Sequence, residues 1–238
     1  MKSRRGNRSS SSDDAVRAIP DGSRIYVAQG SGCPYGFLEK IAEKRDSFQH
    51  LEFISAFLLR RPAPVDYLGN PFKWLSLQPT YALRDVLDHE DFGIIPGRYS
   101  DLDGLFAPGG PLPADAVLCQ ISPPDASGRC SLGTGVGGHV SLLREVPLAI
   151  AQINNEMPFV YGDGECHVTD FDFLVEIDEP LAELQPAAVD EVSEAIARHV
   201  DEFIPDGSTL QFGIGAIPDA VLNSLKSRRD LGLHGGMI

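Results

Sequence analysis

The sequence predicts an α/β fold in which helices cover an open, mostly parallel sheet. One observation is the long, almost continuously apolar run at residues 51–59, which is typical of a strand buried on both faces of such a sheet. A second is the order of strand, glycine turn and helix within residues 208–225. The third is that this order occurs twice in the chain, which indicates two related α/β units.

The remaining elements follow from hydrophobic periodicity and from turn residues. Helices are expected at residues 35–44, 80–87, 100–106, 140–146 and 189–203. Further strands are expected at residues 74–77, 116–121, 149–153, 168–177 and 208–212. A proline-rich loop is expected at residues 60–72 and a hairpin-like excursion at residues 122–135.

An internal repeat sets the expected domain organisation. Residues 19–23 and 204–208 both read Ile-Pro-Asp-Gly-Ser, and each is followed by a strand, a glycine loop and a helix. In this alignment Gly30 falls opposite Gly215. We therefore expect a disordered segment at residues 1–14, a first domain at 15–183, a linker at 184–190 and the start of a second, truncated repeat at 191–238.

The second glycine turn has the features of a ligand loop. Gly213 and Gly215 allow backbone amides to approach a ligand, and Pro218 suits the first turn of the helix that follows. The N-terminus of a helix offers free N–H groups and a positive dipole end to an anion. The alternatives are a plain strand-to-helix connection and a dinucleotide site, although the third glycine of GxGxxG is absent.

Composition narrows the classes of partner. The formal net charge of −14 argues against binding to nucleic acid or to an anionic membrane surface. Residues 1–14 contain no apolar core of a signal peptide, and no run approaches the length of a membrane span. The four cysteines form no CxxC pair, so they predict buried filler rather than a metal site. We expect a cytoplasmic protein.

Two other groups of polar residues have competing interpretations. His139 lies in a glycine-rich loop and is expected to be structural or exposed rather than catalytic. Four acidic residues in or beside residues 168–177 could suggest a metal site, but their alternation favours the solvated face of an edge strand.

Several motifs in the same order resemble the acetyl-CoA hydrolase/transferase family, which includes 4-hydroxybutyrate CoA-transferases. The most specific is LQFGIGAIPDAV at residues 210–221. The others are QISPPD at 120–125, Gly128, CSLG at 130–133, AQIN at 151–154, MP at 157–158, YGD at 161–163 and HVTDFDFLVE at 167–176. The resemblance covers nearly the whole chain from about Ala18 and implies a class I CoA-transferase architecture of two similar domains with acyl-CoA at their junction.

The resemblance also implies site residues. Loop residues expected to bind CoA are Gly213, Ile214, Gly215, Ala216 and Ile217, and candidates for the oxyanion site or its loops are Gly30, Gly32 and Gln211. The family has a nucleophilic Glu where this chain has Gly236. An error at the chain end, a decayed gene or a subunit completed by a partner would each explain that difference.

The expected chemistry is CoA transfer between an acyl-CoA and a small carboxylic acid, or hydrolysis of the thioester, as in acetate metabolism. CoA thioester is then a substrate, and no tightly bound cofactor or metal is expected. The alternative is a non-catalytic CoA-binding or structural subunit. An incomplete second unit predicts a homo-oligomer or a second subunit that carries the rest of that unit.

Overall fold

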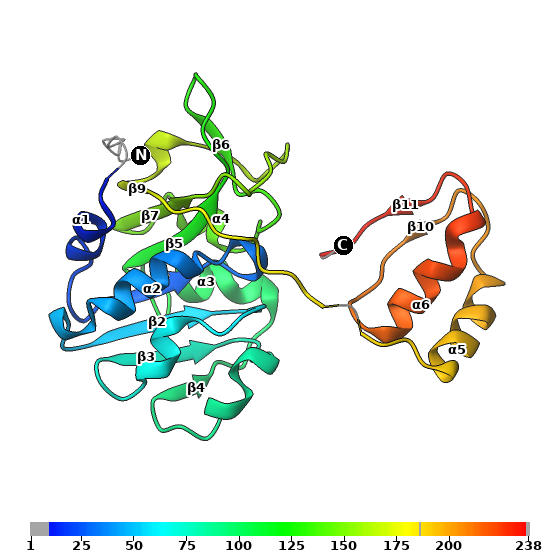
Figure 1. The fold of residues 1–238 in the computed structure, drawn as a ribbon, viewed down its shortest axis with the longest axis horizontal. Helices are drawn as coiled ribbons and strands as arrows, with labels where there is room; N and C mark the ends of the chain where they lie inside the picture. Colours follow the sequence, from blue (N-terminus) through cyan, green and yellow to red (C-terminus); the bar gives the residue numbers. More distant parts are fainter. Residues whose placement is uncertain (1–9, 186, 237–238) are drawn as a thin grey trace. The chain divides into compact units, whose positions relative to one another are not determined.

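The structure is a computed structural model that describes residues 10–185 and 187–236. The chain forms two compact units, Met1–Glu183 and Leu184–Ile238 (Figure 1). The first contains a seven-stranded sheet of order β4-β3-β2-β1-β5-β7-β9, and every neighbouring pair in it is parallel. The predicted α/β class with an open parallel sheet is therefore confirmed.

The strands of this sheet alternate along the chain with helical segments. The strands are β1 Arg24–Val27, β2 Leu51–Ser55, β3 Phe72–Ser76, β4 Phe92–Ile94, β5 Ala116–Ile121, β7 Leu148–Ile153 and β9 Phe173–Glu176. The α-helices are α1 Ser12–Arg17, α2 Tyr35–Glu43, α3 Leu102–Phe106 and α4 His139–Leu142. The 3₁₀ turns are η1 Gly30–Gly32, η2 Arg45–Ser47, η3 Ala63–Tyr67, η4 Tyr81–Val86, η5 Tyr99–Asp101 and η6 Val168–Asp170.

Each face of the sheet has its own hydrophobic core, because successive strand residues point to opposite sides. In β1, Ile25 and Val27 belong to the core that α1 and α2 cover, where Phe53 stacks on Trp74 with ring centroids 5.2 Å apart. Tyr26 belongs to the opposite core, which α3 and α4 cover. Helices therefore lie on both faces of the sheet (Figure 1).

A separate two-stranded ribbon stands beside the sheet. It pairs β6 Arg129–Ser131 with β8 Glu165–His167 in antiparallel register. The hairpin-like excursion expected at residues 122–135 is thus wrong in one respect, since the partner strand comes from a later part of the chain. Residues 132–138, between β6 and α4, return to the edge of the sheet as a glycine-rich loop.

Several elements are shorter or tighter than expected. The strand expected at 51–59 ends at Ser55, because β3 ends at Ser76 and offers no further sheet partner. The helix expected at 80–87 is the 3₁₀ helix η4, and η3 lies in the proline-rich loop. Over six residues, an apolar spacing of three or four does not distinguish a 3₁₀ from an α-helix. The helix expected at 140–146 ends at Leu142.

Two further expectations, for residues 1–14 and 168–177, differ from the structure. Residues 12–14 were expected to be disordered, but α1 begins at Ser12, and the Ser11 side chain accepts the amide of Asp14 as its N-cap. The other part of that expectation, residues 1–9, lies outside the described residues. The edge strand expected at 168–177 is confined to β9, because η6 occupies residues 168–170.

The four acidic residues of this region have different environments. Asp170 accepts the amide of His167, and Asp172 accepts the amide of Ala149. Asp178 accepts hydrogen bonds from Asn155 after β7, and Glu176 is exposed. These four carboxylates do not form a metal cluster.

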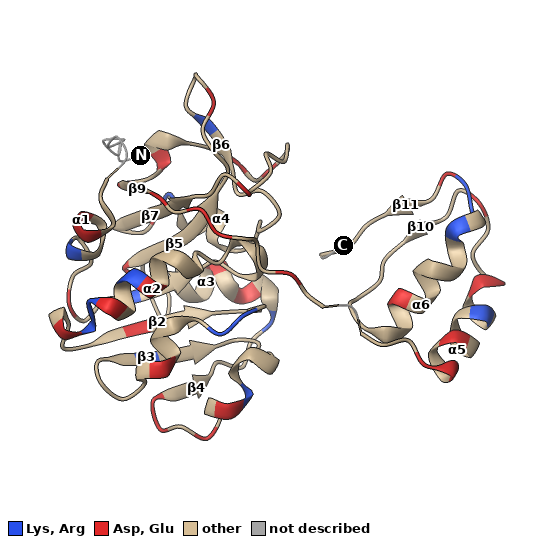
Figure 2. Cartoon of the chain, in the orientation of Figure 1, with Lys and Arg blue, Asp and Glu red and all other residues tan. Residues whose placement is uncertain are grey.

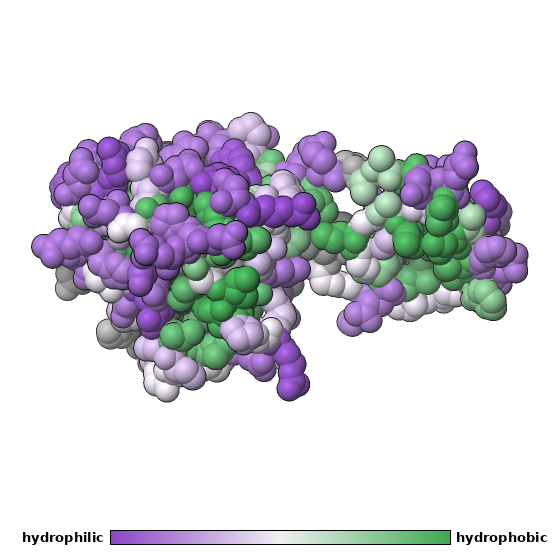
Figure 3. All heavy atoms as spheres, turned by 90° about the horizontal axis from the view of Figure 1, so that it is seen from below, coloured by the Kyte–Doolittle hydropathy of each residue, from purple (hydrophilic) through white to green (hydrophobic). Residues whose placement is uncertain are grey.

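The second unit contains two helices and two short parallel strands. These are α5 Glu191–Asp201, β10 Thr209–Leu210, α6 Ala216–Ser224 followed by η7 Leu225–Ser227, and β11 Gly232–Leu233. Helices α5 and α6 pack against each other. Apolar side chains remain on its surface (Figure 3), among them Val192, 65% exposed, and Phe203, 82% exposed.

The Ile-Pro-Asp-Gly-Ser repeat folds into the same turn twice. In the first unit, Gly22 has φ 81°, the Ser23 hydroxyl donates to the Pro20 carbonyl at 2.6 Å, and Asp21 Oδ1 accepts the amide of His50. That amide belongs to the chain entering the next strand of the sheet.

In the second unit, Gly207 has φ 77° and the Ser208 hydroxyl donates to the Pro205 carbonyl, also at 2.6 Å. Asp206 Oδ1 accepts the amide of Arg229 at 3.0 Å, just before β11. Both units therefore contain the same turn, in which the glycine has a positive φ and the aspartate accepts an amide just before a later strand.

Candidate functional site

The parallel sheet has a topological switch point between β1 and β5. From β1 the chain adds β2, β3 and β4 on one side, and from β5 it adds β7 and β9 on the other. Ligands of open α/β sheets bind outside the carboxyl ends of the strands at such a point. Residues 29–32 follow β1 there, and the glycine-rich loop at residues 132–138 lies against them.

The first candidate glycines stand in the loop after β1. Gly30 has φ 59°, and its N–H donates to the carbonyl of Phe57 at 2.8 Å. The N–H of Gly32 donates to the carbonyl of Gln29 at 3.0 Å. Both amides that the sequence suggests as oxyanion donors are therefore hydrogen-bonded inside the chain.

Gly32 has a second role, in packing. A Cβ at this position would lie 2.8 Å from the carbonyl oxygen of Gly135, closer than real Cβ contacts. The hydroxyls of Ser31 and Thr134 lie 2.7 Å apart beside this crossing. Glycine is needed here because two backbones approach each other directly.

The hydroxyl group of Tyr99 lies at the carboxyl edge of the sheet and accepts two hydrogen bonds. The Tyr99 hydroxyl oxygen accepts hydrogen bonds from Gln29 Nε2 at 2.5 Å and from the Gly138 amide at 3.2 Å. A hydroxyl oxygen has two acceptor sites, so both are used and its own hydrogen is available for donation. Tyr99 is 52% exposed, so this hydrogen can reach a carbonyl or carboxylate oxygen.

Sequence reasoning missed Tyr99 and Gln29. The two residues are 70 positions apart and come from different loops, and neither belongs to a periodic pattern. Gly137 packs against both side chains. A Cβ at this position would lie 2.8 Å from the Tyr99 hydroxyl and 3.0 Å from Gln29 Nε2, so only glycine fits without a shift of these groups.

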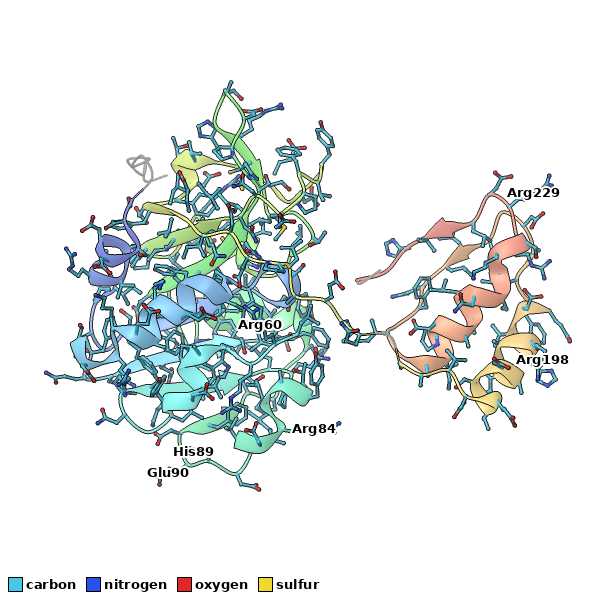
Figure 4. All side chains as sticks on the ribbon, viewed as in Figure 1. Arg60, Arg84, His89, Glu90, Arg198 and Arg229 are labelled. Carbon is cyan, nitrogen blue, oxygen red and sulfur yellow. The ribbon has the colours of Figure 1, made fainter. Side chains whose placement is uncertain are left out.

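A carboxylate of the chain occupies the N-terminus of α2. Glu179 Oε1 accepts the amide of Gly36 at 2.8 Å and Nε2 of Gln152 at 2.9 Å, and Oε2 accepts Nη2 of Arg60 at 2.7 Å. The guanidinium of Arg60, which is labelled in Figure 4, also lies 4.4 Å from the centroid of the Tyr35 ring. The helix dipole and Arg60 both stabilise this carboxylate, so this helix end already holds an anion.

Buried amide side chains connect this helix end to the sheet. Gln152 Oε1 accepts the amide of Phe37, and the Nδ2 group of Asn154 donates to Gln120 Oε1 at 2.7 Å and to the Glu179 carbonyl. Gln120, Gln152 and Asn154 are all buried. Because each is hydrogen-bonded, this network rigidifies the carboxyl edge of the sheet.

His139 is fully buried at the start of α4, which agrees with a structural interpretation and excludes the exposed one. Burial lowers the pKa of its imidazole to about 4, so the ring is neutral at pH 7. Neither ring nitrogen has a hydrogen-bond partner among the described residues.

The second glycine loop belongs to the second unit. It joins β10 to α6, and Gly215, with φ 134°, is the N-cap residue of the helix. Ile214 and Ile217 are each 45% exposed, and Gly213 and Gln211 are exposed as well. The first N–H groups of α6 have no partner within the helix, so the loop presents accessible amides beside a positive dipole end.

Gly236 follows β11 in the same unit. Since β10 and β11 are parallel, the glycine loop after Leu210 and the segment after Leu233 leave the same edge of this small sheet. The His234 amide donates to the carbonyl of Leu210 at 2.9 Å and holds the two segments together there. Gly236 is exposed and has no side chain to offer a nucleophile.

The charge distribution contains few basic groups. Asp and Glu residues are spread over the helices of both units (Figure 2). In the part of the chain that the structure describes, no set of three or more His, Cys, Asp or Glu side chains could hold a metal ion. No helix within residues 10–185 and 187–236 has the length and apolar character needed to cross a membrane.

Known proteins are similar to this chain in sequence. Residues 6–185 match the acetyl-CoA hydrolase/transferase N-terminal domain. The chain is 34% identical over 227 residues to 4-hydroxybutyrate coenzyme A transferase of Clostridium kluyveri, covering 95% of this chain and 53% of that protein. It is 29% identical over 231 residues to succinyl-CoA:acetate/propanoyl-CoA:succinate CoA transferase of Fasciola hepatica, covering 96% of this chain and 48% of that protein.

Solved structures share the fold. RipA from Yersinia pestis superposes with a TM-score of 0.85 at 25% identity, over 95% of this chain and 55% of that one. A 4-hydroxybutyrate CoA-transferase from Porphyromonas gingivalis gives 0.77 at 25% identity, over 97% and 54%. The chain spans about half the length of the curated relatives it matches. Sequence and fold together confirm the predicted resemblance, and the chain belongs to the acetyl-CoA hydrolase/transferase family.

Proposed function

We propose that this chain is part of an enzyme that transfers CoA between an acyl-CoA and a small carboxylic acid, or hydrolyses the acyl-CoA. The observation that carries the proposal is the glycine loop at residues 213–217, which is exposed at Gly213, Ile214 and Ile217 and stands at the N-terminus of α6 in a chain of this family. CoA thioester is then a substrate rather than a tightly bound cofactor.

The acidic composition of the chain explains why backbone amides in the glycine loop, rather than a basic surface, are assigned to CoA. With a formal net charge of −14, the protein attracts the phosphates of CoA only where local groups oppose the overall field. Backbone N–H groups and a helix dipole supply such a local field without a cationic side chain. We assign Gly213, Ile214, Gly215, Ala216 and Ile217 to this role.

The first unit supplies polar groups for the acyl part of the reaction. When a carboxylate attacks the thioester carbonyl, negative charge develops on the carbonyl oxygen, and a fixed donor nearby lowers the barrier. Tyr99 is our strongest candidate for that donor, since Gln29 and Gly138 already fill its acceptor sites. Gly30 and Gly32 could donate only after breaking their present hydrogen bonds. Gln211, exposed beside the second glycine loop, remains a candidate.

The nucleophile must come from elsewhere than position 236. Transfer through an acyl anhydride and a glutamyl thioester needs a carboxylate, and Gly236 has none. We propose that a second subunit completes the active site and supplies this carboxylate. The exposed apolar residues of α5 and of the segment after it, such as Val192 and Phe203, support an interface there. A cytoplasmic location, where CoA is available, is part of this proposal.

Isotope exchange tests the activity. The chain is incubated with acetyl-CoA and isotope-labelled acetate, alone and together with the polypeptide encoded next to it, and the label in acetyl-CoA is measured. We expect exchange only in the mixture, with a covalent CoA adduct on a Glu of the added polypeptide. Fast exchange by the chain alone would contradict the assignment at Gly236. If neither sample exchanges the label and neither hydrolyses acetyl-CoA, the proposed function is contradicted.

A further inference from the structure

Two cysteines face each other across the ribbon of β6 and β8. Cys130 and Cys166 are directly opposed in the antiparallel register, and their Sγ atoms are 3.4 Å apart. Opposed residues of an antiparallel pair have Cα atoms roughly 4.5–5.5 Å apart, which lies within the range that a disulfide spans. The backbone therefore already places both side chains for a bond of about 2.05 Å between the sulfur atoms.

From this juxtaposition we propose that Cys130 and Cys166 form a redox-modification site, which a low-molecular-weight disulfide or an equivalent two-electron oxidant converts to an intrachain disulfide. Both thiols are free in the structure. Cys166 is partly exposed, whereas Cys130 is fully buried. The oxidant therefore reaches Cys166 first, and Cys130 is the resolving thiol.

The reaction balances with a small disulfide as the oxidant. The deprotonated Cys166 sulfur attacks one sulfur of the small disulfide, forms a mixed disulfide and releases one small thiol. Cys130 then loses its proton, attacks Sγ of Cys166 and displaces the second small thiol. The two cysteines lose two protons and two electrons in total, and the small disulfide gains both and leaves as two thiols.

The other two cysteines provide internal controls. Cys33 and Cys119 are fully buried, so an oxidant does not reach their thiols directly. Neither has a sulfur partner in register with it among the described residues. Selective oxidation should therefore join Cys130 to Cys166 and leave Cys33 and Cys119 reduced.

The disulfide would act on the candidate site through the ribbon. The Leu132 amide donates to the Gly164 carbonyl at 2.9 Å, two residues beyond the cysteine pair, and the chain then continues to Gly135 against Gly32. A bond between Cys130 and Cys166 closes a loop between residues 36 positions apart. It should raise the melting temperature of the first unit by roughly 5 °C and slow amide exchange in the ribbon.

The test equilibrates the whole chain with glutathione redox buffers of increasing oxidising strength, followed by intact-mass analysis and peptide mapping without reduction. The proposal predicts a product lighter by two hydrogens, a Cys130–Cys166 cross-linked peptide and a raised melting temperature. Cys166→Ser should show none of these three changes, and Cys33→Ala should behave like the wild type. Free thiols at both positions under oxidising buffer, a glutathione adduct on Cys166 that never resolves, or a cross-link between other cysteines would overturn it. The peptide map of the wild type decides even if a variant fails to fold.

Discussion

Gln29 donates its side-chain N–H to the hydroxyl oxygen of Tyr99 at 2.5 Å, and this bond joins the loop after β1 to the loop after β4. The same oxygen accepts the Gly138 amide, so one hydroxyl holds three segments of the carboxyl edge together. Removal of this oxygen would leave two donors without a partner.

Tyr99→Phe should therefore lower the free energy of unfolding of the first unit by about 1 kcal/mol. Urea titration followed by tryptophan fluorescence measures this, because the single tryptophan, Trp74, is fully buried in that unit. Tyr161→Phe is the matched control, since Tyr161 is 79% exposed. An equal effect of both substitutions would contradict the role given to Tyr99.

The crossing of Gly32 and Gly135 predicts a steric effect. Gly32→Ala places a Cβ 2.8 Å from the Gly135 carbonyl oxygen, and backbone must move to relieve the contact. We expect a loss of about 1–3 kcal/mol in the free energy of unfolding. Gly104→Ala in α3 is the control, because nothing lies within 4 Å of its added Cβ, and alanine favours a helix. A stability of Gly32→Ala equal to that of the wild type would show that the two loops are not tightly packed.

His139 predicts a pH dependence of stability. Its pKa is about 4 in the folded chain, below the usual 6.5, because the ring is buried. Between these values the unfolded chain binds a proton that the folded chain does not. The full contribution is therefore present above about pH 6.5, and about 3 kcal/mol is lost as the pH falls toward 4.

Denaturation at a series of pH values checks this effect. His139→Leu should remove this part of the acid sensitivity, and it should cost little at pH 7 because no hydrogen bond is lost. His50→Gln, at an exposed position, should keep it. If His139→Leu lost as much stability between pH 6.5 and 4 as the wild type, the buried neutral imidazole would not be the cause.

Glu179 predicts an effect on the segment that leaves β9. Glu179→Ala removes an acceptor of Gly36, Gln152 and Arg60, and leaves the buried amide of Gly36 without a partner. The free energy of unfolding should fall by about 2 kcal/mol, with faster amide exchange at residues 177–182. Glu176→Ala, which alters an exposed residue on β9 itself, should change neither measurement.

The parts of the structure that local sequence determines were predictable. The repeated Ile-Pro-Asp-Gly-Ser letters fold into repeated turns because the positive φ of the glycine and the bond from the serine hydroxyl to the proline carbonyl lie within the motif. The long apolar runs at β5 and β7 likewise mark strands buried in a parallel sheet. In both cases the residues that carry the sequence pattern are the ones that form the element.

The parts of the site that depend on distant contacts were not predictable in this way. Gly32 was expected to offer an amide to a ligand, but its carbon faces Gly135 about a hundred residues later. Tyr99 lies in a loop without periodicity, and its hydroxyl becomes chemically distinctive only where Gln29 and Gly138 approach it. No local sequence pattern predicts such contacts between distant segments.

The affinity for CoA, measured by calorimetric titration of the chain, tests the central claim most directly. Ile217→Glu places a negative charge in the first turn of α6, beside the amides assigned to CoA, and should weaken binding about tenfold. Asn223→Glu adds the same charge at an exposed position near the other end of α6 and should leave the dissociation constant unchanged. An absence of CoA binding by the wild-type chain, or equal affinity in all three proteins, would contradict the assignment of residues 213–217 as the CoA loop.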